Sequence, residues 1–387
     1  MNARADSIAP ILVEPRLAGG RGHYAELARA IVAGLSDRAE EVEIVSAPGA
    51  AATCGGLAPD GGRPRIAWQE RPLVSALAEV ETLRRSDPRC RPLLLTARGI
   101  HAAACSMPGS SGDALERSAI LFHWRPGDLL DRVLHRGAAS ARRRVLALAT
   151  TEEVAASLRA LGWRRVRAID YPILAPPPPA AAPWSHVLMA GSLRFNKGLA
   201  SLVALAERWS RDRAEIPLLV QSSTKHAGRH GRREAPLLAR LERSGHRGLR
   251  CDPAPLDRAA YLGNFRGAIT LVAYDPATFA GQVSGVALDA VLSGSPIVAS
   301  DGTEPASLVR EFGAGEVVAF GDADSVDRAI RRLIERWEDA SAAARRAAVV
   351  LAARHDPRRF VEAWLSGVGG LKPRASSDPR RRSTAAR

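Results

Sequence analysis

The chain has 387 residues, a length that suits two domains of ordinary size better than one. Hydrophobic residues make up 46% and charged residues 25%, which excludes a largely disordered chain and predicts a folded core. The formal net charge of +14 comes almost entirely from arginine, because the chain holds only three lysines, Lys197, Lys225 and Lys372. No basic stripe is interleaved with stacking aromatic residues, so we expect solvated helix faces and no nucleic-acid partner.

The four cysteines include no CxxC pair and have no matching histidine spacing. This pattern predicts neither a zinc site nor a disulfide framework, and it favours a reducing compartment. The apolar run at residues 11–13 ends at Glu14 and is too short for a signal peptide or a membrane-spanning helix. We therefore expect a cytoplasmic protein. The tail 372–387 carries six basic residues against one aspartate, which leaves peripheral contact with the anionic inner face of a membrane open.

Short apolar segments alternate with glycine-containing turns and helical patterns through the first half of the chain. A helix is expected at residues 23–35, and another follows Thr151 and ends at Gly162. The expected strands are residues 8–13, 41–46, 91–96, 119–122, 145–149 and 166–169.

A proline-rich segment, APPPPAAAP at residues 175–183, divides the chain nearly in half. Consecutive prolines lack backbone donors and favour an extended spacer. The strand and helix alternation then resumes, with strands expected at residues 186–190, 218–221, 269–273, 296–299 and 315–319.

This alternation is typical of βαβ units, so we predict an α/β fold with two Rossmann-like, doubly wound parallel-sheet domains. The expected division is an N-terminal domain at 1–175, a linker at 176–183, a C-terminal domain at 184–350, a helix at 351–370 and a disordered basic tail at 371–387.

The first segment that could carry chemistry is GSLRFNKG, residues 191–198, which follows an expected strand and precedes an expected helix. Such a loop can aim backbone donors and a helix N-terminus at an anion, while Arg194 and Lys197 supply charge-assisted hydrogen bonds. The spacing is not that of a Walker A motif. The alternative is an ordinary turn with arginine and lysine facing solvent.

The second segment runs from Tyr274 to Ser300 and contains an expected helix that begins near Ser284 and Gly285. Serine is a good N-cap, and glycine lets a ligand approach the backbone closely, so this helix start is a second candidate anion cradle. Asp289 lies one and a half turns into the helix, within reach of a ribose hydroxyl. The alternative is a surface carboxylate near a helix start.

These two segments resemble the GT-B fold glycosyltransferases, specifically the family-4-like retaining enzymes, also called glycosyl transferases group 1. That family reads G-x5-KG after a strand and later SGV-x2-EA-x3-G-xP-[IV]-[IV]. The matching residues are Gly191, Lys197, Gly198, Ser284, Gly285, Val286, Asp289, Ala290, Gly294, Pro296, Ile297 and Val298. The resemblance covers most of residues 184–340 and extends only loosely to the first half.

The resemblance implies a nucleotide-sugar donor held between two domains that face each other across a cleft. Arg194 and Lys197 would grip the diphosphate, the amides of Ser284, Gly285 and Val286 would cap it, and Asp289 would hold the ribose. No metal and no cofactor other than the donor would be needed.

In the first half, Gly20 belongs to a glycine-rich turn at residues 19–22 that opens the helix at His23, where backbone could approach the sugar. A merely flexible turn is the alternative. His123 follows an expected strand and is the better candidate for a sugar-contacting catalytic histidine than His101, although either could be a structural histidine.

One departure from the family pattern concerns the pair of acidic residues eight positions apart, because this chain has Gly281 and Asp289. Asp275 or Tyr274 could substitute for the missing acid, the enzyme could belong to a branch that lacks it, or activity could have been lost. The leading hypothesis is a glycosyltransferase that moves a sugar, with retention, onto a saccharide or lipid-linked acceptor in surface-polysaccharide biosynthesis. The alternatives are a GT-B nucleotide-sugar epimerase and a catalytically impaired nucleotide-sugar-binding subunit.

Overall fold

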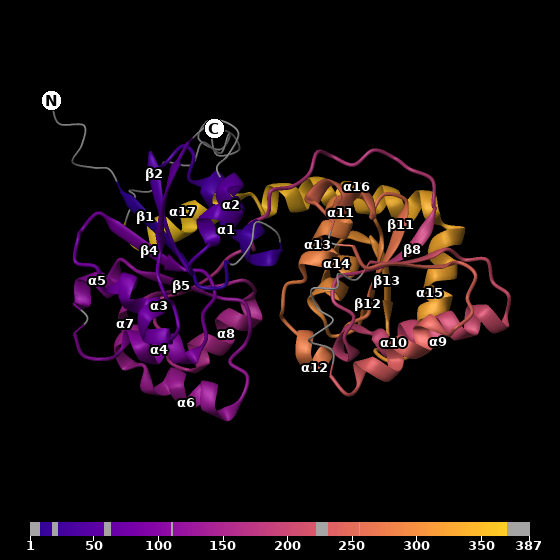
Figure 1. The fold of residues 1–387 in the computed structure, drawn as a ribbon, viewed down its shortest axis with the longest axis horizontal. Helices are drawn as coiled ribbons and strands as arrows, with labels where there is room; N and C mark the ends of the chain where they lie inside the picture. The colour runs from indigo at the N-terminus through magenta and orange to yellow at the C-terminus, as the bar shows by residue number, and fades with distance from the viewer. Residues whose placement is uncertain are drawn as a thin grey trace, which may run out of the picture.

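The protein is described here from a computed structural model, which covers residues 8–17, 22–57, 63–109, 111–221, 231–254 and 256–369. It contains two parallel β-sheets, each with helices packed on both of its faces (Figure 1). The predicted α/β fold with two doubly wound sheets is confirmed. The predicted tail at 371–387 lies outside the described residues.

The first sheet has seven strands in the order β3-β2-β1-β4-β5-β6-β7. Its strands are β1 (Ala9–Glu14), β2 (Glu41–Ser46), β3 (Arg65–Glu70), β4 (Cys90–Leu94), β5 (Ala119–Phe122), β6 (Leu146–Ala149) and β7 (Val166–Ala168). Its helices are α1 (His23–Gly34), α2 (Ala50–Cys54), η1 (Gly55–Leu57), α3 (Ala76–Val80), η2 (Glu81–Arg84), α4 (Gly99–Cys105), α5 (Gly112–Glu116), α6 (Leu129–Gly137), α7 (Ala139–Arg144) and α8 (Glu152–Ala160).

The second sheet has six strands in the order β10-β9-β8-β11-β12-β13. Its strands are β8 (His186–Ala190), β9 (Leu218–Gln221), β10 (Leu249–Asp252), β11 (Ala268–Val272), β12 (Ile297–Ser300) and β13 (Gly315–Val318). The helices in this half are η3 (Phe195–Lys197), α9 (Leu199–Arg211), α10 (Glu234–Glu242), α11 (Arg258–Gly263), α12 (Pro276–Phe279), α13 (Gly285–Leu292), α14 (Glu304–Phe312), α15 (Ala323–Glu335), α16 (Trp337–Arg354) and α17 (Pro357–Gly367).

All of the predicted strands are present within two residues of their expected ends, but β3 and β10 were not predicted. Both form the outer strand on one side of their sheet, and both carry charged side chains that are partly or fully exposed. An edge strand buries little of its surface, so it lacks the continuous apolar run that identifies a central parallel strand.

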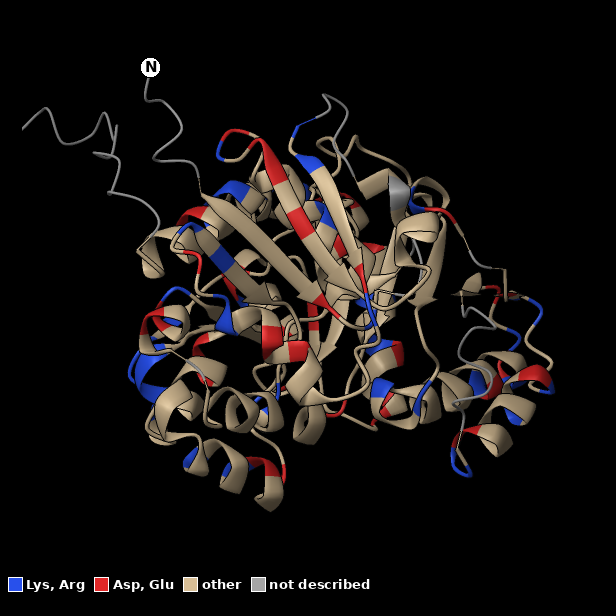
Figure 2. Ribbon diagram, turned by 60° about the vertical axis from the view of Figure 1, so that its left-hand side comes forward, with Lys and Arg blue, Asp and Glu red and all other residues tan. Residues whose placement is uncertain are grey.

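Consecutive residues of the central strands enter different apolar clusters, because side chains alternate across a sheet. Leu12 packs with α1 and α17 on one face of the first sheet, whereas Val13 packs with α3, α4 and α8 on the other. Both faces are therefore covered, as the continuous apolar strands require. Figure 2 shows lysine and arginine interspersed with aspartate and glutamate along the helices.

The chain returns to the first domain at its C-terminal end. Helix α16 runs along the second domain, and α17 then packs against α1 of the first (Figure 1). Asp356 caps α17 and Pro357 occupies its first turn, so two separate helices occupy the region where one helix at 351–370 was expected. Among the described helices, none combines the length and the apolar character needed to cross a membrane.

In both sheets the strand order reverses beside the first strand, between β1 and β4 and between β8 and β11. Ligands of doubly wound sheets bind outside the carboxyl ends of the strands at such a reversal. The loop that follows β8 and the loop that follows β11 are the two segments singled out from the sequence, so the topology places both at the reversal in the second sheet.

Candidate active site

The loop after β8 is shaped by two glycines with left-handed backbone conformations, Gly191 (φ 94°) and Gly198 (φ 85°). A Cβ atom at position 198 would lie 2.6 Å from the carbonyl oxygen of Ala273, which follows β11. Only glycine permits this approach, because any larger residue would combine a strained backbone with a steric clash. The loop therefore ends in close contact with the neighbouring strand.

Two further contacts join the loop after β8 to the segment after β11. The amide of Asp275 donates to the carbonyl oxygen of Asn196 at 2.9 Å. A Cβ atom at Gly191 would lie 3.5 Å from Cγ2 of Val286 in the first turn of α13. The two motifs predicted to hold a diphosphate are thus adjacent in the fold, although about 90 residues separate them in the sequence.

The N-terminus of α13 provides the backbone donors of this site. The hydroxyl of Ser284 caps the helix by accepting a hydrogen bond from the amide of Ala287 at 3.2 Å. No heavy atom lies within 4 Å of the place a Cβ would take at Gly285, so open space adjoins the first turn. A helix start with free amides beside open space is suited to an anion.

Lys197 brings a partly buried positive charge to the same place. Its Nζ atom lies 5.3 Å from the ring centroid of Tyr274 and 6.0 Å from that of Phe279. Burial, together with repulsion from Arg194, lowers the pKa of Lys197 to about 8. A neighbouring anion would offset both effects, so the geometry favours a negatively charged ligand next to Lys197.

Asp289, the predicted ribose ligand, lies at the expected position on α13 but has a protein partner. Its carboxylate forms a bidentate ion pair with Arg258, with distances of 2.7 and 3.1 Å, and the hydroxyl of Tyr261 also hydrogen-bonds to it. Burial raises the pKa of Asp289, and Arg258 opposes this shift. A ribose hydroxyl would therefore share the carboxylate with Arg258.

Asp275, one predicted replacement for the missing acid, is used locally. Its carboxylate caps α12 by accepting a hydrogen bond from the amide of Ala277 at 2.9 Å. Its second oxygen accepts from the hydroxyl of Thr278 at 3.3 Å. Both oxygens are engaged by α12, so Asp275 has a structural role whether or not it also contacts a substrate.

The glycine at position 281 leaves no room for a side chain. Gly281 has φ 65°, and a Cβ there would lie 2.7 Å from Cβ of Glu153 and 3.5 Å from its carboxyl carbon. The hydroxyl of Thr151 donates to the carbonyl oxygen of Gly281 at 2.7 Å. The N-terminus of α8 in the first domain therefore packs directly on this loop of the second domain, and the side chain of Glu153 fills the space next to Gly281.

On the side of the first domain, three aromatic side chains form a cluster that contains the predicted His123. The ring of His23 stacks on Tyr171 at 5.5 Å, and the Tyr171 hydroxyl lies 3.1 Å from Nδ1 of His23. His123 meets His23 edge to face at 5.6 Å. Burial, together with the charge of Lys197 in the other domain, lowers the pKa of His23. Gly20, predicted to face the donor, lies outside the described residues.

His123 is buried, and its Nε2 donates to the carbonyl oxygen of Leu95 at 2.7 Å. Burial lowers the pKa of His123 to about 3, so its imidazole is neutral near pH 7. A neutral ring with Nε2 protonated has Nδ1 available as an acceptor. His123 can therefore accept a hydrogen bond, but it cannot serve as a charged acid at neutral pH.

Glu14 is an ionisable residue of this region that the sequence did not single out. It is fully buried and accepts hydrogen bonds from the hydroxyl of Thr96 at 2.6 Å and from the amide of Arg16 at 2.9 Å. Burial raises its pKa to about 7. Glu14 ends β1 and Thr96 follows β4, so the pair spans the strand reversal of the first sheet. The sequence signal was a carboxylate that directly ends an apolar strand before a glycine-rich turn.

No group of three or more histidine, cysteine, aspartate or glutamate side chains within the described ranges is arranged to hold a metal ion.

Solved structures share this two-sheet arrangement. Anabaena HepE in complex with UDP superposes with a TM-score of 0.67 and 14% identity, covering 94% of this chain and 100% of that chain. A glycosyltransferase from Rickettsia africae ESF-5 gives 0.65 and 12% identity over 94% and 99% of the two chains. The UDP-forming alpha,alpha-trehalose-phosphate synthase from Burkholderia vietnamiensis gives a TM-score of 0.61 and 12% identity over 94% of this chain and 98% of that chain.

No protein-family model and no curated protein matches the chain by sequence. The fold is the GT-B fold of glycosyltransferases.

We expect Glu14→Gln to stabilise the protein much more at alkaline pH than at pH 5. The folded pKa of about 7 lies above the ordinary value of 4.5, so ionisation of Glu14 costs folding free energy as the pH rises between these values. Above pH 7 the folded protein bears the full free-energy cost of holding an ionised Glu14. Glu14→Gln removes this cost, because glutamine is not charged. Urea unfolding should give the variant an advantage of at least about 1 kcal/mol at pH 8.5.

The matched control is Glu40→Gln, which changes an exposed glutamate of the same domain. A stability difference for Glu14→Gln that is the same at pH 5 and pH 8.5 would contradict the assignment of a raised pKa.

Proposed function

We propose that the protein is a glycosyltransferase that moves a sugar from a nucleotide-diphosphate sugar to a saccharide or lipid-linked acceptor. The observation that carries this proposal is the adjacency of Lys197 and the open N-terminus of α13 at the strand reversal of the second sheet. Anabaena HepE, which has the same fold, has been solved with UDP and with UDP-glucose. These structures support a nucleotide sugar as the donor here.

In the proposed reaction, the protein stabilises the nucleoside diphosphate as it leaves the sugar. Lys197 and Arg194 would contact the phosphate oxygens, and the first-turn amides of α13, from Gly285 and Val286, would cap them. The side chains of Arg194 and Lys197 are partly buried, so their electrostatic effect on the departing charge is stronger than it would be in water. The proposed reaction uses no metal and no cofactor other than the donor. Retention at the anomeric carbon rests on the family resemblance.

The cluster of His23, His123 and Tyr171 would face the transferred sugar. In this role neutral His123 accepts a hydrogen bond from a sugar hydroxyl through Nδ1, and the Leu95 carbonyl fixes the ring in the required tautomer. Gly20 would let the backbone approach the same sugar. This arrangement binds and orients the sugar without a charged histidine.

Glu153 would take the place of the acid that position 281 lacks. Its carboxyl carbon lies 3.5 Å from the place that a Cβ at residue 281 would take, and no ion pair to it is present among the described residues. A carboxylate beside the anomeric carbon stabilises the positive charge that develops on the sugar during glycosyl transfer. The acid would thus come from the first domain instead of the second.

A patch on the first domain supports peripheral contact with a membrane. Ile100 on α4 and three residues of α6, Leu129, Leu130 and Val133, are at least half exposed, and α4 packs against α6. The exposed side chains of Arg98, Arg132 and Arg136 belong to the same two helices or their ends. Apolar side chains flanked by arginines suit the surface of an anionic bilayer, which would place the protein at the cytoplasmic face, where surface polysaccharides on lipid carriers could be extended.

The second candidate is a catalytically impaired nucleotide-sugar-binding subunit, which the glycine at position 281 favours. Calorimetry with UDP-, GDP- and ADP-glucose, combined with a turnover assay, separates the two candidates. Binding with transfer or slow donor hydrolysis supports the enzyme. Binding without any turnover supports the subunit, and the absence of binding to all three nucleotide sugars would reject both.

Lys197→Met is expected to weaken binding of the best nucleotide sugar about tenfold or more, because it removes a charge-assisted contact with the diphosphate. Arg247→Met is the control, since Arg247 is an exposed cation of the same domain. Isothermal titration calorimetry measures both affinities. Equal affinities of the two variants would show that residues 191–198 form only a turn.

The affinity of the unaltered protein for the nucleotide sugar should fall as the pH rises above about 8. Above its folded pKa of about 8, Lys197 loses its proton, so the affinity falls by up to about tenfold per pH unit if only the ammonium form binds. Titrations between pH 7 and 9.5 measure this slope. Lys197→Met should lack it, and an identical slope in that variant would assign the pH dependence to another group.

Glu153→Gln should reduce kcat about tenfold or more while changing nucleotide affinity less than about twofold, because the carboxylate acts on the developing sugar charge. The control is Glu152→Gln, which alters the neighbouring glutamate that pairs with Arg159 on an exposed face. Each variant also loses a negative charge in the first turn of α8. This loss alone would lower the free energy of unfolding by at most about 1 kcal/mol. Equal kcat values for the two variants would reject a role for Glu153 in catalysis.

Leu130→Asp should reduce binding to vesicles of phosphatidylglycerol and phosphatidylcholine severalfold, because it places a negative charge in the patch on α4 and α6. Val74→Asp, at a highly exposed position of the same domain outside α4 and α6, is the control. Co-sedimentation at low and high salt measures both variants. Unchanged sedimentation of Leu130→Asp would show that these helices do not bind the membrane.

A further inference from the structure

A second concentration of positive charge lies in the first domain, at the end of its sheet remote from the domain junction. A pocket of about 480 Å³ opens there between the amino ends of the strands and the end of α17. Arg91, Arg117 and Arg165 lie at or just before the starts of β4, β5 and β7, whereas the donor site lies at the carboxyl ends of the strands of the other sheet. The lining consists of Arg91, Asp113, Glu116, Arg117, Arg143, Arg165, Val368 and Gly369.

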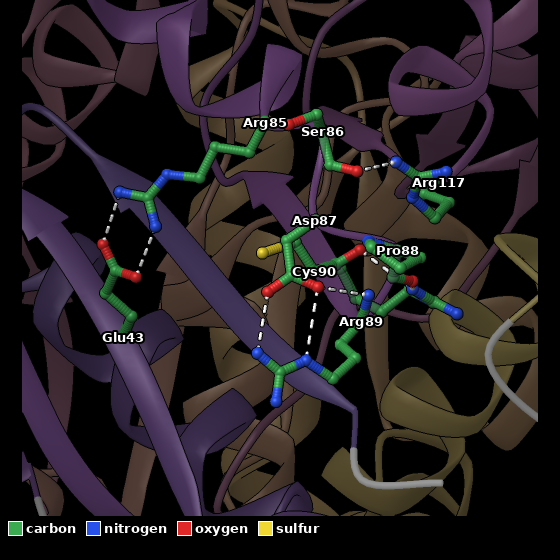
Figure 3. A network of polar contacts seen from close by, with 9 residues as sticks. Glu43, Arg85, Ser86, Asp87, Pro88, Arg89, Cys90 and Arg117 are labelled. Carbon is green, nitrogen blue, oxygen red and sulfur yellow. Dashed lines mark hydrogen bonds and ion pairs between the residues drawn. The ribbon is translucent and has the colours of Figure 1, made fainter. Parts of the chain in front are cut away.

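Backbone carbonyl groups hold three of the four arginines in place. Arg91 donates to the carbonyl oxygens of Pro88 and Cys90 at 2.6 and 2.9 Å. Arg117 donates to that of Ser86 at 3.1 Å (Figure 3).

Arg165 is held in the same way, because it donates to the carbonyl oxygens of Glu116 and Gly367. A carbonyl oxygen orients a guanidinium group without neutralising its charge, so these side chains are fixed but remain cationic.

Within the described ranges, no carboxylate lies within ion-pair distance of any of these four guanidinium groups. Glu116 pairs with Arg144 instead, at 2.7 Å. The adjacent arginines show the contrast in Figure 3, where Arg85 is paired with Glu43 and Arg89 with Asp87.

Two buried guanidinium nitrogens of this lining also lack a hydrogen-bond partner within the part of the chain that the structure describes. The Nε atoms of Arg91 and Arg117 are buried and unpartnered among the described residues. Burial and the proximity of Arg117 lower the pKa of Arg91, and the nearby Asp87 opposes this shift only in part.

We propose that this pocket binds a phosphate-bearing anion, such as inorganic phosphate, pyrophosphate or a phosphate monoester. Four arginines against Asp113 and Glu116 leave an excess of two positive charges in the lining. Guanidinium groups match phosphate oxygens in geometry, and groups already held in place lose little conformational entropy when they bind.

The pocket also touches the segment that returns from the second domain. Arg165 holds the carbonyl of Gly367 at the end of α17, and Val368 and Gly369 line the pocket. An anion bound there would therefore also secure the end of α17, which packs against α1. Binding should raise the unfolding temperature, because a ligand of the folded state stabilises it.

The experiment titrates the full-length protein with inorganic phosphate and with pyrophosphate by calorimetry at constant ionic strength. The double variant Arg117→Gln/Arg143→Gln should bind at least about tenfold more weakly, because two charge-assisted contacts are lost. Arg143→Gln alone provides a variant without a folding risk, since Arg143 is exposed and only its charge is removed. Lys197→Met removes an anion contact of the proposed donor site, so the anion binding that remains in this variant belongs to the arginine pocket, and Arg247→Gln controls for overall charge.

A lipid phosphate is distinguished from a soluble one by vesicles containing phosphatidic acid, tested in the Leu130→Asp background to exclude binding through α6. Tight binding of the soluble anions that both arginine variants weaken supports the proposal with a soluble ligand. Vesicle binding that Arg143→Gln abolishes, without soluble binding, supports it with a lipid phosphate. Binding that only Lys197→Met weakens, or no binding in either format, overturns it.

Discussion

The carbonyl oxygen of Ala273 and the backbone of Gly198 approach so closely that a Cβ at position 198 would lie 2.6 Å from that oxygen. This contact joins the loop after β8 to the end of β11, and the other features of the candidate site depend on it. The loop can place Lys197 over Tyr274 and bring Gly191 beside Val286 only because it turns back at a left-handed glycine. The parallel strand order supplies the rest of the constraint, because it places the ends of β8 and β11 side by side.

The contact between the two domains depends on a second glycine, at position 281. Gly281 lets the N-terminus of α8 pack directly on the second domain, where Thr151 donates to its carbonyl oxygen and Glu153 fills the adjacent space. An acid at position 281 would need this same space. The departure from the family pattern is therefore coupled to the way the two domains meet, and the nearest carboxylate belongs to the opposite domain.

Burial decides the charge states of the groups at the junction. Lys197 has a lowered pKa, Glu14 a raised one, and His123 remains neutral, each because its charged form loses hydration. Asp289 keeps its charge partner in Arg258. Apart from the carboxylate of Glu153, the first domain thus presents mainly neutral groups and the second presents cations, a division that would suit the proposed donor, a neutral sugar attached to an anionic diphosphate.

Apolar runs bounded by glycine and proline predicted the ends of the central strands to within two residues, because a parallel strand buried on both faces must be continuously apolar. They also predicted the loop at 191–198 and the start of α13.

The edge strands β3 and β10 were missed, because they bury little surface. The carboxylate at Glu14, the pairing of Asp289 with Arg258 and the use of Asp275 as a helix cap depend on residues that only the fold brings into contact. The sequence by itself determined the α/β architecture and the positions of the two loops that we propose to bind phosphate, because both rest on local patterns. Only the tertiary structure decided which side chains share the junction, because the space beside Gly281 is filled from the other domain.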